Sequence, residues 1–76
     1  MANALATQVG GNHYKEFKIQ PAEFIEKNNL GFLEGCIIKR VCRLGRKGGK
    51  EQGIEDLNKI IHEAKLILEM RYGIKE

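Results

Sequence analysis

The residues best suited to chemistry lie in segment 39–50, which contains six basic side chains and no acidic one. The rest of the chain has seven Lys or Arg and ten Asp or Glu residues, so the net charge of +3 divides into +6 here and −3 elsewhere. This asymmetry favours a local site for an anion over a generally basic surface. The alternative is a set of solvent-exposed residues that complement a helix dipole.

The sequence Arg46-Lys47-Gly48-Gly49 is the local pattern with the clearest chemical use. Consecutive glycines let backbone N–H groups approach an oxyanion, and Arg and Lys add charge-assisted hydrogen bonds. The pattern differs from a Walker P-loop, in which the lysine follows the glycines and a Ser or Thr comes next. We therefore expect a phosphate-binding turn, with a solvent-exposed turn between two helices as the alternative.

A second candidate is segment 10–14, which contains Gly11, His13 and Tyr14. Glycine beside a histidine and an aromatic ring can bind a phosphate or stack on a base, although a plain turn explains these residues equally well. The chain shows no Ser-His-Asp, Cys-His or paired-carboxylate pattern, and neither His13 nor His62 has a Cys or His at metal-ligand spacing. We therefore predict no catalytic triad, no metal site and no cofactor.

Apolar periodicity predicts that three helices position these residues in a small all-α domain. Pro21 begins the first helix, which ends after about two turns at Asn28. The second helix covers 32–44, with an apolar stripe on one face and Lys39, Arg43 and Arg46 on another. The residues of that apolar stripe are Leu33, Ile37, Val41 and Leu44.

The third predicted helix covers 54–72 and has the clearest pattern in the sequence. Its apolar residues keep a near-heptad spacing, Gly73 follows as a C-cap, and Glu55 and Lys59 form a favourable i, i+4 pair. Between the second and third helices, residues 45–53 are predicted to form a flexible basic loop. The apolar stripe of the third helix consists of Ile54, Leu57, Ile61, Ala64 and Leu68.

The length of the chain bounds its organisation. We expect residues 1–9 to be a flexible N-terminus and residues 10–76 to be a single domain, which opens with a short extended segment over 14–19. A chain of 76 residues buries so little surface that a lone monomer is expected to be only marginally stable. The third helix also offers more apolar surface than two short helices cover, so we expect a homo-oligomer.

Composition excludes several other classes of protein. No apolar run approaches the roughly 20 residues of a membrane span, and the N-terminal residues lack the features of a secretory signal, so we expect a soluble, cytoplasmic protein with no membrane partner. Cys36 and Cys42 lie six residues apart on one helix, which is too far for an intrachain disulfide. The basic residues are confined to one helix end and loop, so we expect no duplex nucleic acid partner.

Several short blocks occur in a fixed order over about residues 9–68. They are Gly10-Gly-Asn-His-Tyr-Lys15, Ile19-Gln-Pro-Ala-Glu-Phe-Ile25, Asn28-Asn-Leu-Gly-Phe-Leu-Glu-Gly35, Ile38-Lys39, Arg43, Lys47-Gly-Gly49, Ile54-Glu-Asp-Leu57, Lys59 and His62. Together they resemble the SaV-like phage proteins, a family that includes a small podophage nucleotide kinase and many short proteins of uncharacterised role. The chain departs from the family pattern at Cys36, Arg40 and Glu63, where an Asn, a Tyr and an aromatic residue are usual, and in a longer loop over 50–53.

The resemblance implies a phage accessory protein that acts inside the bacterial host cell. We expect a homo-oligomeric sponge that sequesters cyclic or linear nucleotide signals of antiphage defence; the alternatives are a nucleoside monophosphate kinase acting on deoxynucleotides and an adaptor that binds a host protein. In the kinase alternative, Glu34 or Asp56 orients a hydroxyl group or a metal ion. The residues expected to bind the nucleotide are Gly11, His13, Tyr14, Lys39, Arg43, Arg46, Lys47, Gly48 and Gly49.

Overall fold

The computed structural model describes residues 16–46 and 48–75, which form three α-helices. These are α1 (Pro21–Lys27), α2 (Phe32–Arg43) and α3 (Gly49–Tyr72). The described residues contain no strand, so the predicted all-α class is confirmed. The predicted flexible N-terminus and the first two residues of the predicted extended segment lie outside the described residues, and residues 16–19 form a turn followed by bends.

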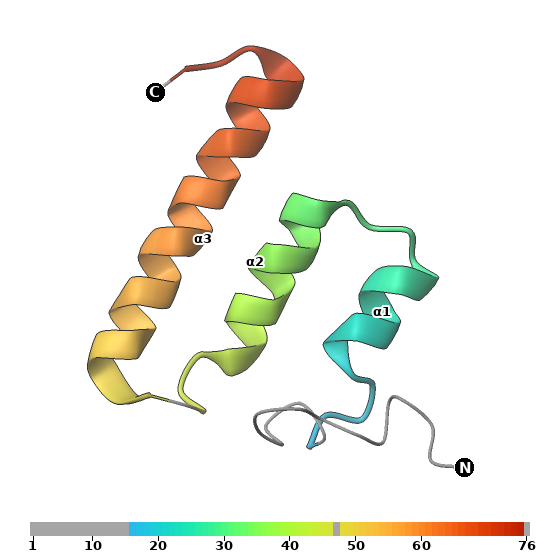
Figure 1. The fold of residues 1–76 in the computed structure, drawn as a ribbon, viewed down its shortest axis with the longest axis vertical. Coiled ribbons are helices and arrows are strands. Elements are labelled where there is room, and N and C mark those ends of the chain that lie inside the picture. Colours follow the sequence, from blue (N-terminus) through green and yellow to red (C-terminus); the bar gives the residue numbers. More distant parts are fainter. Residues whose placement is uncertain (1–15, 47, 76) are drawn as a thin grey trace.

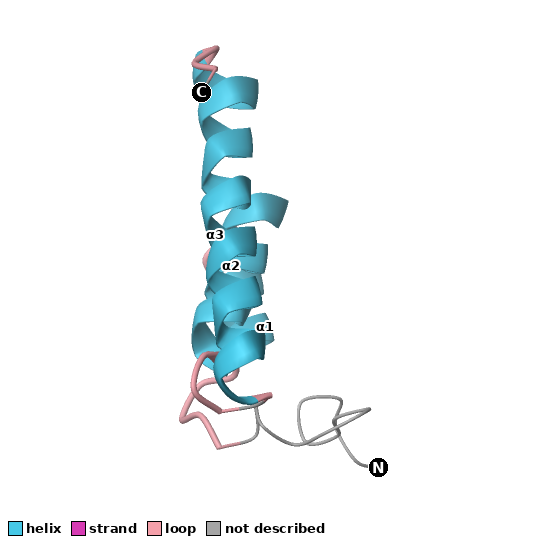
Figure 2. Ribbon diagram, turned by 90° about the vertical axis from the view of Figure 1, so that its left-hand side faces the viewer, coloured by secondary structure: helices cyan, strands magenta, loops and turns pink. Residues whose placement is uncertain are grey.

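The three helices lie side by side in a single layer. The middle helix α2 contacts both α1 and α3 and runs antiparallel to them (Figure 1). Viewed along the layer, the three helices lie one behind another (Figure 2). The layer measures 47 × 31 × 18 Å, and its Cα radius of gyration is 14.2 Å, against about 11 Å for a compact domain of this length. Within residues 16–46 and 48–75, no further element therefore covers either broad face of the layer.

The most deeply buried side chains between α2 and α3 are polar. No hydrophobic residue is buried in the part of the chain that the structure describes. Val41 and Ile61, which belong to the predicted apolar stripes of α2 and α3, each remain 53% exposed. The contact between α2 and α3 instead buries two carboxylates, those of Asp56 and Glu63. The layer thus lacks the apolar core on which small domains normally depend.

Close packing joins α1 to α2. Pro21 occupies the start of α1, where its missing N–H needs no partner, and the side-chain amide of Asn28 donates to the Phe24 carbonyl at 2.9 Å where the helix ends. Gly35 of α2 is buried against Ile25, and a Cβ at this glycine would lie 3.3 Å from the Ile25 side chain. The predicted two-turn first helix is confirmed, and the predicted second helix is correct to within one residue.

The turn from α2 to α3 is shorter than predicted. The expected loop over 45–53 is wrong in its second half, because α3 begins at Gly49 rather than Ile54. Gly48 and Gly49 have φ values of 86° and 70°, a left-handed conformation that glycine adopts without strain, and a Cβ at Gly48 would lie 2.4 Å from the Cβ of Gln52. These two glycines complete the turn. The chain then continues as helix, with Glu51 favourably placed in the first turn.

The rest of α3 follows the sequence pattern. Its C-cap is Gly73, with a φ of 68°, as predicted. The Glu55–Lys59 ion pair is present at 3.5 Å. Within residues 16–46 and 48–75, no helix has the length and apolar character needed to cross a membrane.

Candidate anion-binding site

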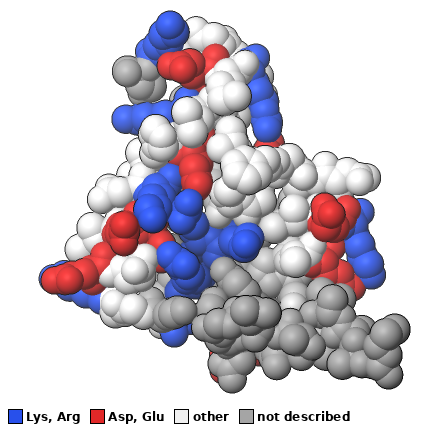
Figure 3. All heavy atoms as spheres, viewed as in Figure 1, with Lys and Arg blue, Asp and Glu red and all other residues white. Residues whose placement is uncertain are grey.

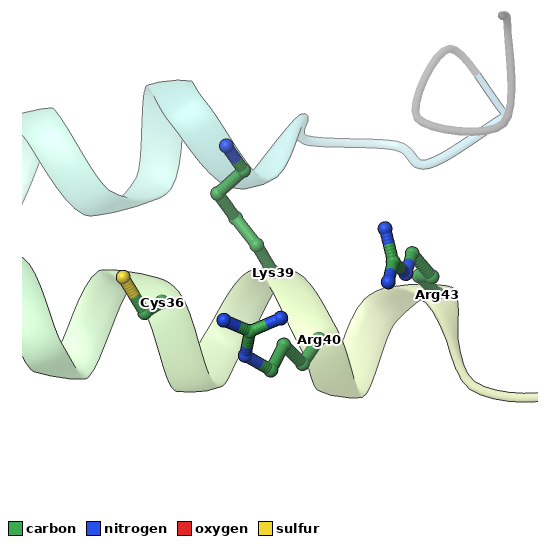
Figure 4. Close-up of a pocket in the computed structure, with 4 residues that line it drawn as sticks. All are labelled: Cys36, Lys39, Arg40 and Arg43. Atoms are coloured by element: carbon green, nitrogen blue, oxygen red, sulfur yellow. The ribbon is translucent and has the colours of Figure 1, made fainter. Parts of the chain in front are cut away.

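The middle helix places three basic side chains around one cavity. Lys39, Arg40 and Arg43 line this basic cavity together with Cys36, and its volume is about 180 Å³ (Figure 4). The four residues have the spacing i, i+3, i+4 and i+7, which brings them to one face of a helix. The volume is about six times the share of one water molecule in the liquid, so a phosphate group fits.

Arg43 is held by a buried carboxylate of α3. Its Nε and Nη2 donate to Oδ2 and Oδ1 of Asp56 at 3.2 and 2.7 Å. The Asp56 side chain is only 1% exposed, and Gln52 of the same helix also donates to its Oδ1, at 3.1 Å. The hydrogen bonds from Arg43 hold the pKa of Asp56 below its ordinary value of 3.8, although burial opposes this shift. Asp56 is therefore ionised at neutral pH.

Arg40 makes a second, parallel connection to α3. Its Nε and Nη2 each donate to a carboxylate oxygen of Glu63 at 2.9 Å, and these hydrogen bonds raise the pKa of Arg40. Nη1 of Arg40 makes no hydrogen bond to any residue that the structure describes. Two-pronged contacts of this kind fix the direction of a guanidinium group, so both arginines have defined positions at the cavity.

Lys39 supplies charge that these pairs do not neutralise. Its side chain is exposed and extends from α2 toward α1 (Figure 4). It forms no ion pair with another residue of the described ranges. The three cations of the cavity and the two carboxylates behind them leave a local charge of +1. On this face of the molecule, basic surface gathers over α2 with acidic surface beside it (Figure 3).

A wider groove between α1 and α2 adjoins the basic cavity. Its volume is about 420 Å³, and it shares Cys36 and Lys39 with that cavity. Phe32, at the start of α2, lines the groove and is 81% exposed. The other lining residues, mostly small or apolar, are Ala22, Ile25, Glu26, Leu30, Gly31 and Gly35. A molecule that occupies both spaces meets positive charge at one end and, at the other, a mostly apolar surface that includes the Glu26 side chain.

Only two of the predicted nucleotide ligands come together in this site. Lys39 and Arg43 both line the basic cavity, and Arg43 does so while paired with Asp56. Four other predicted ligands lie outside the described residues, and these are Gly11, His13, Tyr14 and Lys47.

The remaining predicted ligands have structural roles at the turn between α2 and α3. Arg46 lines neither cavity: its guanidinium lies 4.3 Å from the ring centroid of Phe17 and pairs with Glu16 at 3.4 Å. Gly48 and Gly49 provide the left-handed backbone that begins α3. The turn therefore has an explanation that needs no ligand.

The pairing of Asp56 and Glu63 with the arginines of the site is the feature that sequence reasoning missed. Asp56 and Glu63 are seven residues apart, so they lie on one face of α3, and they meet a basic pair on α2 that is three residues apart. Each pair keeps to one face of its helix and the two pairs have opposite charge, and this periodicity is the signal that could have identified them. Across the described residues, no group of three or more His, Cys, Asp or Glu side chains could hold a metal ion.

A family model described as a protein of unknown function (DUF3310) matches residues 9–65, about three quarters of the sequence. The chain belongs to the DUF3310 family. The matched region contains every residue that lines the two cavities of this DUF3310 protein, together with both buried carboxylates. No curated protein and no solved structure matches the chain.

Proposed function

We propose that this DUF3310 protein binds a nucleotide across the basic cavity and the adjoining groove. The observation that carries the proposal is that Cys36 and Lys39 line both spaces. A nucleotide has the same two-part character, because an anionic phosphate is joined to a flat aromatic base. In this arrangement Lys39 and Arg40 contact phosphate oxygens, and the exposed ring of Phe32 stacks on the base.

The ion pairs behind the cavity favour this use. A guanidinium already held by a carboxylate loses little conformational freedom when a ligand arrives, so more of the interaction energy contributes to affinity. Nη1 of Arg40 and the ammonium group of Lys39 are the donors that the described structure leaves for an anion. The proposed contacts to phosphate therefore come from Lys39 and Arg40.

Sequestration has more support than phosphoryl transfer, because the carboxylates considered for a kinase mechanism are held by other side chains. Glu34 accepts hydrogen bonds from Arg71, which lower its pKa to about 2. Asp56 is enclosed by Arg43 and Gln52. In the phage setting that the resemblance to SaV-like proteins implies, the specific role we propose is that the protein captures cyclic or linear nucleotide signals of antiphage defence and holds them unchanged.

Calorimetric titration with a panel of linear and cyclic nucleotides tests the proposal, with inorganic phosphate as the probe for the basic cavity alone. We expect Lys39→Gln to weaken nucleotide binding about 10- to 100-fold, the loss of one charge-assisted hydrogen bond. Lys50→Gln is the matched control, because Lys50 is exposed, belongs to the same basic segment and lines neither cavity. Phe32→Ala should weaken nucleotide binding and leave phosphate binding unchanged.

Three outcomes would contradict the proposal. Equal losses in Lys39→Gln and Lys50→Gln would show that general basic charge, rather than the cavity, attracts the ligand. The absence of binding to every nucleotide in the panel would favour the adaptor alternative. Chromatography of the released nucleotide completes the test: intact recovery supports sequestration, whereas catalytic formation of a diphosphate from ATP and a deoxynucleoside monophosphate would establish a kinase.

A further inference from the structure

The apolar stripe of α3 points out of the layer. Ile54, Leu57 and Ile61 are 51%, 49% and 53% exposed. Each of these residues comes directly after a residue of α3 that faces α2. Leu57, for example, comes after Asp56, which is buried against α2. At about 100° per residue, one position along the helix turns the side chain from the α2 contact toward a broad face of the layer.

The other two helices add apolar side chains to the same face. Because α2 and α3 are antiparallel, the residue that follows an α3-facing residue of α2 points to the same broad face of the layer as the α3 stripe. Arg40 faces α3, and the next residue, Val41, is 53% exposed. On α1, which lies on the other side of α2, the residue that precedes an α2-facing residue points to this same broad face. Ile25 contacts α2, and the residue before it, Phe24, is 45% exposed. We call this surface the apolar face. It consists of Phe24, Val41, Ile54, Leu57 and Ile61.

The apolar face lies opposite the basic cavity. Val41 and Lys39 are two residues apart on α2, which is about 200° around the helix. Lys39 lines the basic cavity, so Val41 points to the opposite side of the layer. The two broad faces thus differ in chemistry, and a molecule that covers the apolar face leaves the basic cavity open.

We propose that a second copy of this chain covers the apolar face. A single layer with no buried hydrophobic residue among those described needs another layer to complete a core, and a second copy is present wherever the chain is made. The spacing of three and four along Ile54, Leu57 and Ile61 is that of a helix-pairing seam, which matches itself. The 47 × 31 Å outline of the layer is large enough to hold the about 800 Å² per partner of a standard interface.

The two-fold axis runs across the helices at the level of Ile61. A rotation about this axis stacks each helix on its own antiparallel copy, so Phe24 and Val41 are covered along with the α3 stripe. A two-fold axis parallel to the helices would instead set α3 against α3 or against the much shorter α1 of the second copy, and would leave part of the apolar face uncovered. Ile61 lies near the middle of α3, so it meets Ile61 of the partner subunit. This inference does not depend on the proposed function.

Light scattering on the ligand-free protein and cysteine cross-linking test the inference. We expect a mass of about 17 kDa, twice the 8.6 kDa of the chain. In a Cys36→Ser, Cys42→Ser background with unchanged mass and helicity, Ile61→Cys should form an intermolecular disulfide under mild oxidation. Lys59→Cys is the matched control, because position 59 lies about 200° around α3 from position 61; it should stay reduced.

Two results would overturn the inference. One is a helical monomer of 8.6 kDa that unfolds cooperatively, since such a chain would need no second layer. The other is an assembly that Lys59→Cys cross-links and Ile61→Cys does not, since the copies would then meet through the opposite face. Because no nucleotide is present, neither result bears on ligand binding, and a failure of the nucleotide titrations leaves the dimer intact.

Discussion

Replacement of Asp56 by Asn tests how much the fold depends on its buried charges. The substitution keeps the size of the side chain and removes the charge that Arg43 contacts at 2.7 and 3.2 Å. Loss of one partner from a fully buried pair costs about 3–5 kcal/mol. The Arg43 side chain is 28% exposed and keeps part of its hydration, so we expect a loss of about 2–3 kcal/mol in the free energy of unfolding.

Circular dichroism during thermal unfolding, at one fixed protein concentration, measures this effect. For a chain of this length the expected loss lowers Tm by about 10–20 °C. Glu55→Gln is the matched control, because Glu55 is the neighbouring residue and its pair with Lys59, at 3.5 Å, is exposed on both sides. That variant should lose less than about 0.5 kcal/mol. The reasoning is refuted if Asp56→Asn lowers Tm no more than Glu55→Gln does.

The same ion pair decides which variants report on ligand binding. Charge reversal at Arg43 would set a second carboxylate against Asp56, so its effect on binding would be mixed with a loss of stability. Lys39 is exposed and makes no ion pair with the described part of the chain. Lys39→Gln therefore separates binding from folding, and Arg43→Glu does not.

Two further predictions concern acid and backbone geometry. Because Arg71 lowers the pKa of Glu34 from 4.5 to about 2, the stabilisation from this pair should be complete above pH 4.5 and lost as the pH falls toward 2, and Glu34→Gln should flatten the pH profile of Tm in that range. A profile that Glu34→Gln leaves unchanged would contradict this. Gly48→Ala should lower the free energy of unfolding by more than about 1 kcal/mol, because the φ of Gly48 is 86° and the new Cβ would meet Gln52. Gly45→Ala is the control, because Gly45 has a φ of 73° but open space around it, and it should cost less in the same unfolding measurement. Equal losses in the two variants would show that the crowding at Gly48 is unimportant.

The helices follow from local patterns, whereas the α2–α3 turn does not. Pro21, the heptad stripe and Gly73 set most of the helix boundaries, because each acts on the backbone within a few residues. Gly53 resembles the loop glycines before it in sequence, so the pattern predicts that α3 begins at Ile54, whereas it begins at Gly49. Gly45, Gly48 and Gly49 all have a left-handed φ at this turn, whereas Gly53 lies inside α3, and the sequence does not distinguish the two kinds of glycine.

The candidate site, like the fold, is only partly predictable from the sequence. The basic residues of α2 are evident from their charge and spacing, but their acidic partners depend on the register between α2 and α3, which no local pattern specifies. Arg40 and Glu63 show this well, since the sequence presents them as two separate departures from the SaV-like pattern. In the structure they contact each other at 2.9 Å, so the two departures form a single ion pair.

Polar contacts act within each layer and apolar contacts act between layers, and this separation makes the proposed nucleotide site and the proposed dimer compatible. Within the layer, Asp56 and Glu63 fix the register of α3 on α2, because a two-pronged pair tolerates little displacement. Hydrophobic burial is not directional, and in the proposed dimer it acts between layers, through Val41 and Ile61. The polar contacts define each layer and the apolar contacts hold two layers together. Lys39, on the opposite face from Val41, then stays accessible to a nucleotide in every copy, so assembly and capture do not compete for the same surface.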